Sequence, residues 1–135
     1  KAALSARAPA LRGSGRAGAP PPRIVFLYPG GGAQYPGAGA GLLAQSPVFA
    51  AAVADCFARL PAEAPADLRA TMFDCDLSDA GARLRMARSA YAIPALFILE
   101  YAYTRLWEGW GIRPDAILAL TPEIMNQLVI TPQTT

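Results

Sequence analysis

A run of three glycines after a short apolar stretch is the part of the sequence whose residue types point most directly to chemistry. Gly30, Gly31 and Gly32 follow residues 24–28, and Gln34 comes two positions later. Backbone N–H groups that no side chain covers, at the carboxyl end of a buried strand, can stabilise an oxyanion. A tight turn that requires positive φ explains the same glycines without chemistry. A phosphate loop is disfavoured because the Gly-Lys-Ser/Thr ending is missing.

The composition excludes several catalytic mechanisms for this chain alone. Its 135 residues contain no histidine, which removes Ser-His and Cys-His pairs and His-ligated metals. The 2 cysteines are too few for a disulfide framework or a four-thiolate zinc site, and they fit a reducing setting. Cys56 lies on the apolar side of a predicted helix and is interpreted as a core thiol. Cys75 stands between two aspartates that would raise its pKa.

Two further patterns resemble ligand sites but lack required residues. Asp74, Asp76 and Asp79 suggest a calcium loop, yet its glycine and closing glutamate are missing, so a solvated acidic loop is preferred. The alternating glycines from Gly37 to Gly41 have the spacing of a dinucleotide loop. They lie too far beyond the strand and have no suitably placed acidic residue.

Charge and hydropathy argue against nucleic-acid and membrane partners. Residues 1–23 carry all five of their charges as Lys or Arg, sparsely placed and without aromatic side chains to stack on bases. The longest apolar run, residues 90–99, is far shorter than the roughly 20 residues of a membrane span. We therefore expect a soluble, cytoplasmic protein that binds neither nucleic acid nor membrane.

The elements that must position the glycine loop follow from the periodicity of apolar residues. The order of strand, helices and strand predicts an α/β layer fold with a parallel sheet, whose strands we expect to be buried on both faces. The aromatic residues of the longest predicted helix are interpreted as core or helix-packing residues. The predicted strands cover 24–28 and 116–120, and the helical segments lie near 42–43 and over 47–60, 68–72, the residues after 78–79, and 91–110.

Composition divides the chain into three parts. Residues 1–22, with three glycines and then Pro20, Pro21 and Pro22, predict an extended linker from a preceding domain. Residues 23–120 form the predicted α/β domain. Residues 121–135 are rich in Thr, Gln and Asn, and their origin does not follow from the sequence.

Four stretches in this order resemble the N-terminal part of the malonyl-CoA:acyl-carrier-protein acyltransferase domain of modular polyketide synthases. The residues before Arg23 resemble the linker between a ketosynthase and that domain. The resemblance implies a partial α/β-hydrolase-like three-layer core, with a short parallel sheet and flanking helices. The matching stretches are residues 24–35, 46–49, 93–97 and 106–118.

The resemblance also implies a reaction. Members of this family pass an acyl group from acyl-CoA to a serine on a sharp strand-to-helix turn, paired with a distant histidine, and then to the phosphopantetheine thiol of an acyl carrier protein. The family's Gly-Gln-Gly loop supplies an oxyanion-hole N–H from its central residue, which is Gly31 here. Without the glutamine side chain we expect a looser loop. No cofactor or metal is expected to be bound by this chain itself.

Three positions depart from the family pattern, and together they predict loss of activity. Gly31 replaces the glutamine of the loop, and Ile93 stands where the family usually has glutamine before Pro-Ala-Leu-Phe. Thr121, followed by Pro122, occupies the position of the nucleophilic serine. We therefore expect no catalytic residue, with Gly30, Gly31, Gly32 and Gln34 as a remnant of the oxyanion loop and Ile93 and Thr121 as vestigial positions.

The preferred interpretation is a truncated, inactive acyltransferase remnant that packs against the ketosynthase and linker of a polyketide synthase. One alternative is a segment of an active acyltransferase that loads malonyl-type units from CoA onto acyl carrier protein. Another is a docking surface for a carrier protein or a trans-acting acyltransferase. Acyl specificity, product and oligomeric state do not follow from these residues.

Overall fold

The computed structural model describes residues 23–119, so the predicted linker at 1–22, Leu120 and the tail at 121–135 lie outside the described residues. Two strands and five helices make up the described part. All the predicted elements are present, with small differences in their bounds. They are β1 (Val25–Tyr28), α1 (Ala40–Gln45), α2 (Pro47–Ala58), α3 (Leu68–Phe73), α4 (Ala80–Met86), α5 (Ser89–Gly109) and β2 (Ala116–Ala119).

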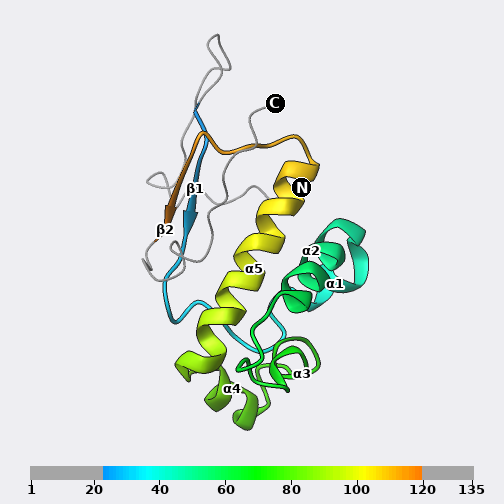
Figure 1. Ribbon diagram of the computed structural model, residues 1–135, viewed down its shortest axis with the longest axis vertical. Coiled ribbons are helices and arrows are strands. Elements are labelled where there is room, and N and C mark those ends of the chain that lie inside the picture. Colours follow the sequence, from blue (N-terminus) through cyan, green and yellow to red (C-terminus); the bar gives the residue numbers. More distant parts are fainter. Residues whose placement is uncertain (1–22, 120–135) are drawn as a thin grey trace, which may run out of the picture.

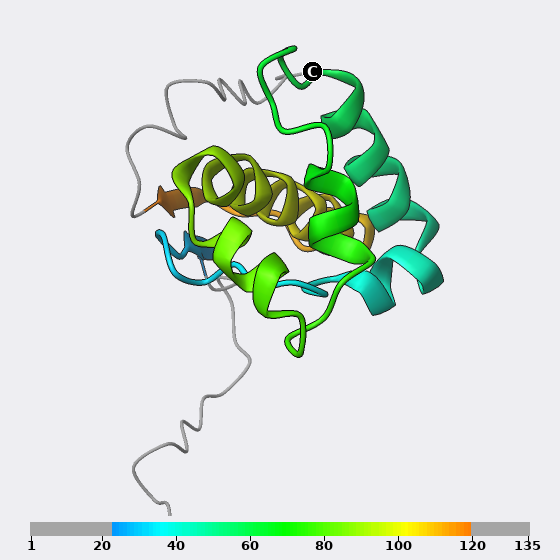
Figure 2. The ribbon, with the colours of Figure 1, turned by 90° about the horizontal axis from the view of Figure 1, so that it is seen from below.

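The two strands pair in parallel, as predicted, and α5 runs between them and the other helices. Val25 lies opposite Ala116 and Tyr28 opposite Ala119. The sheet flanks one side of α5, α1 and α2 flank the other, and α3 and α4 lie near its N-terminal end (Figures 1 and 2). The arrangement is a partial α/β fold in which one central helix contributes to both packing layers.

Local sequence explains where α2 begins and which face it buries. Ser46 is the N-cap, its Oγ accepts a hydrogen bond from the Phe49 N–H at 3.2 Å, and Pro47 fills the first helical position. Phe49 and Val53 are completely buried, one turn apart on the face that packs against α5. The predicted helix over 47–60 is therefore confirmed, ending at Ala58 rather than Leu60.

The central helix α5 is buried along most of its length, as predicted. Its buried side chains recur at helical spacing from Ala92 to Leu106. Gly111, with φ +82°, follows its C-terminal end and donates its N–H to the Glu108 carbonyl oxygen at 2.9 Å. In residues 23–119 no helix is long and apolar enough to cross a membrane.

The expectation that both strands are buried on both faces is wrong for the described residues. Val25, Leu27 and Leu118 are 58%, 62% and 57% exposed. Alternate side chains point to opposite faces of a strand, and only one face of the pair is directed at α5. A continuous apolar run is typical of a strand covered on both faces, whereas the described residues form a sheet of two strands with one face directed at α5.

The aromatic residues of α5 divide into two groups. Tyr91, Phe97 and Tyr101 pack against the hydrophobic core, as predicted. Tyr103 is 37% exposed and packs edge-on against the buried Phe49 of α2, as a helix-packing residue does. Trp107 and Trp110 are 43% and 63% exposed, so they are not core residues, and their rings pack against each other. They lie in the last turn and at the C-cap of α5.

Candidate functional site

The glycine loop lies at the carboxyl end of β1, where the sequence predicts it. Gly32 has φ +108°, a conformation that side chains other than hydrogen rarely adopt, so one glycine is explained by the turn itself. Gly31 has no positive φ, and a Cβ at Gly31 would meet nothing within 4 Å. Neither backbone geometry nor close packing therefore explains why residue 31 is a glycine.

Gln34 connects this loop to α4. Its Oε1 accepts a hydrogen bond from the Gly32 N–H at 2.9 Å, and its Nε2 donates to the Met86 carbonyl oxygen at 2.9 Å. One amide side chain thus ties the loop to the last turn of α4, three residues before α5 begins. We expected a loose loop from the sequence. The two hydrogen bonds of Gln34 restrain its last glycine, Gly32.

The parallel register brings the two sequence-distant parts of the predicted site to one edge of the sheet. Tyr28, the last residue of β1, pairs with Ala119, the last residue of β2. The chain segments that follow both strands therefore leave from neighbouring positions, at the end of the sheet near the start of α5 (Figure 1). Thr121 itself lies outside the described residues.

Ile93 lies in the second turn of α5, at that same end of the helix. Its side chain is 45% exposed. An aliphatic side chain there can make no hydrogen bond to the glycine loop or to a ligand. The structure therefore places Ile93 and the glycine loop at the same end of the fold.

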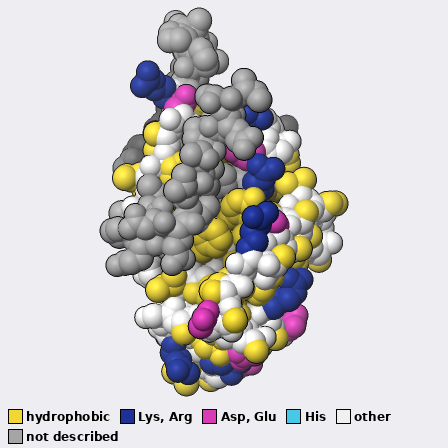
Figure 3. All heavy atoms as spheres, in the orientation of Figure 1, with side chains coloured by type: hydrophobic (Ala, Val, Ile, Leu, Met, Phe, Trp, Pro, Cys, Tyr) yellow, Lys and Arg dark blue, Asp and Glu magenta, His cyan; other side chains and the backbone are white. Residues whose placement is uncertain are grey.

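A groove of about 500 Å³ lies between β1 and α5, and sequence analysis did not predict it. Its walls are mostly apolar, including Phe26, Leu96 and Trp107. Figure 3 shows hydrophobic side chains gathered in the middle of this face of the molecule. Only tertiary packing creates this groove, because its walls are separated by about seventy residues of sequence.

Glu100 lines the groove and is its most unusual residue. Its Oε1 is buried and has no hydrogen-bond partner among the described residues. Burial raises its pKa from 4.5 to about 7. The sequence offered one signal for this buried acid: Glu100 stands between Leu99 and Tyr101 on a helix that is apolar nearly all round.

Tyr28 and Thr104 link the sheet to α5 beside this groove. The Thr104 hydroxyl donates to the Glu100 carbonyl oxygen at 2.7 Å, which leaves its oxygen to accept a hydrogen bond from the Tyr28 hydroxyl. Burial, partly offset by the bond to Thr104, raises the pKa of Tyr28, so the phenol stays protonated at neutral pH. These groups hold β1 on α5 and offer no activated nucleophile.

The cysteines behave as predicted. Cys56 is buried in the core, and desolvation raises its pKa to about 11, which makes it a poor nucleophile. The pKa of Cys75 is also raised, first by desolvation, then by Asp79, and to a smaller extent by its neighbour Asp74. Within residues 23–119 no group of three or more His, Cys, Asp or Glu side chains could hold a metal ion.

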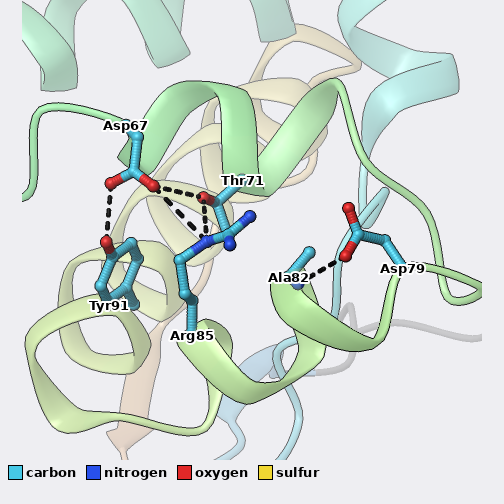
Figure 4. Close-up of polar contacts among 6 residues, drawn as sticks. All are labelled: Asp67, Thr71, Asp79, Ala82, Arg85 and Tyr91. Carbon is cyan, nitrogen blue, oxygen red and sulfur yellow. Dashed lines mark hydrogen bonds and ion pairs between the residues drawn. The ribbon is translucent and has the colours of Figure 1, made fainter.

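Two of the remaining motifs prove to have structural roles. Asp79 caps α4, because its Oδ1 accepts the Ala82 N–H at 2.8 Å (Figure 4). The glycines at 37 and 39 have φ +84° and +76°, and a Cβ at Gly39 would lie 3.0 Å from Phe49 Cζ. Conformation and close packing account for both glycines without a dinucleotide.

A polar cluster of Asp67, Thr71, Arg85 and Tyr91 joins α3, α4 and α5 (Figure 4). The Tyr91 hydroxyl donates to Asp67 at 2.6 Å, and the Arg85 Nε lies 3.4 Å from the same carboxylate. Arg85 also donates to the Thr71 hydroxyl at 3.2 Å. The bond from Tyr91 is the main cause of the lowered pKa of Asp67. The cluster fixes the start of α5 relative to the short helices.

Comparison with known proteins relates this fold to one domain type. No protein-family model matches the sequence. The solved acyltransferase domain of ZmaA shares 34% identity and a TM-score of 0.65 over 73% of this chain. The acyltransferase domain from the second module of the salinomycin polyketide synthase shares 37% identity and a TM-score of 0.58 over 72%. The chain is a homologue of the N-terminal part of a polyketide synthase acyltransferase domain.

Curated polyketide synthases give the same relationship for this acyltransferase segment. A phenolphthiocerol/phthiocerol polyketide synthase protein of Mycobacterium tuberculosis is 41% identical over 96 residues, which are 71% of this chain and 6% of that protein. Polyketide synthase GfsA of Streptomyces halstedii is 38% identical over 96 residues, 71% of this chain and 1% of that protein. The chain spans about a fifth of each solved domain, 22% and 21%.

Proposed function

We propose that this segment belongs to a polyketide synthase acyltransferase domain that no longer transfers acyl groups and whose role is structural, packed against the ketosynthase and the linker that precedes it. The pairing of β1 with β2 carries the proposal. It brings the positions after both strands to one edge, and the family's nucleophilic serine follows the second strand. This sequence has Thr121 and Pro122 there.

The departures act on different parts of one mechanism. Pro122 has no N–H to donate to an oxyanion. The chain has no histidine to act as a general base. Loss of a triad nucleophile or base lowers kcat on the order of a million-fold in subtilisin, so a remaining Gly31 amide would not restore useful turnover.

The test of inactivity is the intact mass of the polypeptide that contains this segment, before and after incubation with malonyl-CoA. We expect no malonyl adduct. Thr121→Val, which removes the hydroxyl but keeps the shape, and the control Thr131→Val in the same tail locate any adduct. An adduct lost only in Thr121→Val would make Thr121 the nucleophile, and an adduct present in both variants would place a nucleophile elsewhere; either refutes inactivity.

The structural role has its own test. Deletion of residues 24–118 from the parent polypeptide should lower the melting temperature of the ketosynthase region or weaken its dimer. Thr121→Val serves as the control that removes a site residue and leaves the packing surface in place. Unchanged melting and unchanged association after the deletion would contradict a structural role.

A working acyltransferase completed by a serine beyond these residues is the second candidate, and the braced glycine loop favours it. Gln34 holds Gly32, while the Gly31 N–H donates to no other described residue. In that case Gly31→Pro, which removes the N–H, would slow malonyl transfer. Gly31→Ala keeps the N–H and meets no atom within 4 Å, so it is the matched control. Equal rates for both variants would exclude an oxyanion role for Gly31.

A further inference from the structure

The groove between β1 and α5 has the size and the walls of a site for a small organic molecule. Its volume of about 500 Å³ lies within the range of roughly 300–1,000 Å³ that is usual for ligand pockets. Phe26 and Tyr28 alternate along β1 with more exposed residues and so face α5. Leu96 and Trp107 of α5 line the other side. Two walls from different elements thus leave a space that a compact apolar group can fill.

Aromatic rings supply much of these walls, and two of the rings are held in place by other rings. Tyr103 packs edge-on against Phe49, with ring centroids 5.2 Å apart. Trp107 packs edge-on against Trp110, with centroids 5.3 Å apart. The face of an aromatic ring carries partial negative charge and attracts cations, so a wall of this kind favours a positively charged ligand. The aromatic side chains that line the groove are Phe26, Tyr28, Tyr35, Tyr103 and Trp107.

Glu100 is the only charged side chain among the described residues that line the groove. Its Oε1 is buried and has no hydrogen-bond partner among those residues. Glu108, which lies farther along α5, is already paired with Arg105 at 2.8 Å. Burial raises the pKa of Tyr28, and the charges of Glu100 and Glu108 raise it further, so the potential in the groove is negative. A ligand that suits this groove therefore brings a hydrogen-bond donor with a positive charge.

We propose that the groove binds an organic cation, whose ammonium group donates a hydrogen bond to Glu100 and whose apolar body packs between β1 and α5. The ammonium supplies both the donor and the opposite charge that a buried carboxylate requires. The last side-chain bond of a glutamate rotates easily, so either of its oxygens can turn toward the donor. An anionic ligand is repelled by the same carboxylate. The glycines at 30–32 are not among the described residues that line the groove, so this site does not depend on acyl transfer.

Titration of the full chain with three probes that share an indole ring tests this preference for positive charge. The probes are tryptamine, which is a cation, tryptophol, which is neutral, and indoleacetate, which is an anion. In a ¹H–¹⁵N correlation spectrum the amide cross-peaks of Phe26 and Tyr103 report on the groove, and that of Thr71 reports on the polar cluster away from it. At pH 8 we expect tryptamine to bind about tenfold more tightly than tryptophol, because it makes a hydrogen bond to a charged group. Indoleacetate should bind more weakly than either.

The pH dependence of tryptamine binding tests the role of Glu100 without any substitution. With a pKa of about 7, Glu100 is ionised in about a tenth of the molecules at pH 6 and about nine-tenths at pH 8, so the apparent affinity should rise about ninefold. Tyr28 and Tyr103 also face the groove, but burial raises their pKa values, so they keep their protons over this range. A flat profile would contradict the proposal.

Two variants locate the effect. Glu100→Gln keeps the shape of the side chain and should abolish both the preference for tryptamine and its pH dependence. Glu108→Gln removes the same charge farther along α5 and, as the matched control, should keep both. Equal affinity for the three probes, absence of shifts at Phe26 and Tyr103, or an unchanged preference in Glu100→Gln would overturn the proposal. Groove cross-peaks that shift on dilution without a probe would overturn it as well, because a second copy of the chain would then fill the groove.

Discussion

Gly39 is the position where backbone conformation and packing act together, and its replacement by alanine should destabilise the fold strongly. Gly39 has φ +76°, and a Cβ there would lie 3.0 Å from Phe49 Cζ and 3.1 Å from Leu99 Cδ2. The left-handed conformation costs a non-glycine residue about 1–2 kcal/mol. Forcing a methyl group into a packed core costs about 1–3 kcal/mol more. Both neighbours are buried between α2 and α5, so they have little room to move.

Two other glycines separate these contributions. Gly111 has φ +82° but nothing within 4 Å of the added Cβ, so Gly111→Ala should cost only the backbone strain, about 1–2 kcal/mol. Gly41 lies in α1 without positive φ and also faces open space. Gly41→Ala should therefore stabilise the fold by about 0.5–1 kcal/mol, because alanine is the better helix former. The expected order of stability is Gly41→Ala, unmodified chain, Gly111→Ala and Gly39→Ala.

Urea denaturation followed by far-ultraviolet circular dichroism measures this series. A loss of about 2–5 kcal/mol in Gly39→Ala lowers the melting temperature by about 8 °C or more, since 1 kcal/mol corresponds to about 4–8 °C in a domain of this size. The reasoning is refuted if Gly39→Ala is no less stable than Gly111→Ala, because the close approach to Phe49 and Leu99 would then cost nothing.

Three further results are expected from the polar contacts. Gln34→Ala removes the bonds to Gly32 and Met86 and should lower the free energy of unfolding by about 1–2 kcal/mol, with faster hydrogen exchange at Gly32; unchanged exchange would contradict the bracing role. Glu100 has a native pKa of about 7, above its ordinary 4.5, so its contribution to stability is fully present below pH 4.5 and is lost as pH rises from 4.5 to 7. The melting temperature of Glu100→Gln should fall less over this interval, and equal slopes would exclude Glu100 as the cause. Asp67→Ala breaks contacts with Tyr91, Thr71 and Arg85, so it should lower the melting temperature more than Asp55→Ala, which removes one exposed pair with Arg59; equal effects would show that the cluster adds nothing.

Much of the fold could be predicted because its signals are local. Ser46 followed by Pro47 sets the start of α2, and the apolar spacing from Phe49 to Cys56 defines its buried face. Both strands are short apolar runs bounded by turn residues, and their parallel pairing follows from the helices between them. The burial of the strands was predicted wrongly because an apolar run such as Ile24 to Tyr28 indicates only that a strand is suited to burial on both faces. The amount of cover actually present depends on residues beyond the run itself.

The candidate site was only partly predictable for the same reason. The glycine loop is recognised by composition, whereas the contact from Gln34 to Met86 spans 52 positions and cannot be seen in a local pattern. Trp107 and Trp110 stand three positions apart, the spacing of neighbours on one helix face, and only the tertiary structure shows that they are exposed. The clash that makes Gly39 necessary requires Phe49 from one helix and Leu99 from another.

The sequence by itself determined the types and order of the elements, the absence of histidine and the position of the glycine loop after the first strand. These properties depend on residue identity and short-range spacing. Only the tertiary structure decided that β1 and β2 end side by side, that Gln34 braces the loop, and that Glu100 lies buried in a groove without a partner among the described residues. Those properties depend on contacts between segments that are distant in the sequence. The distances between these segments, and the burial of Glu100, are set when helix α5 packs between the sheet and α2.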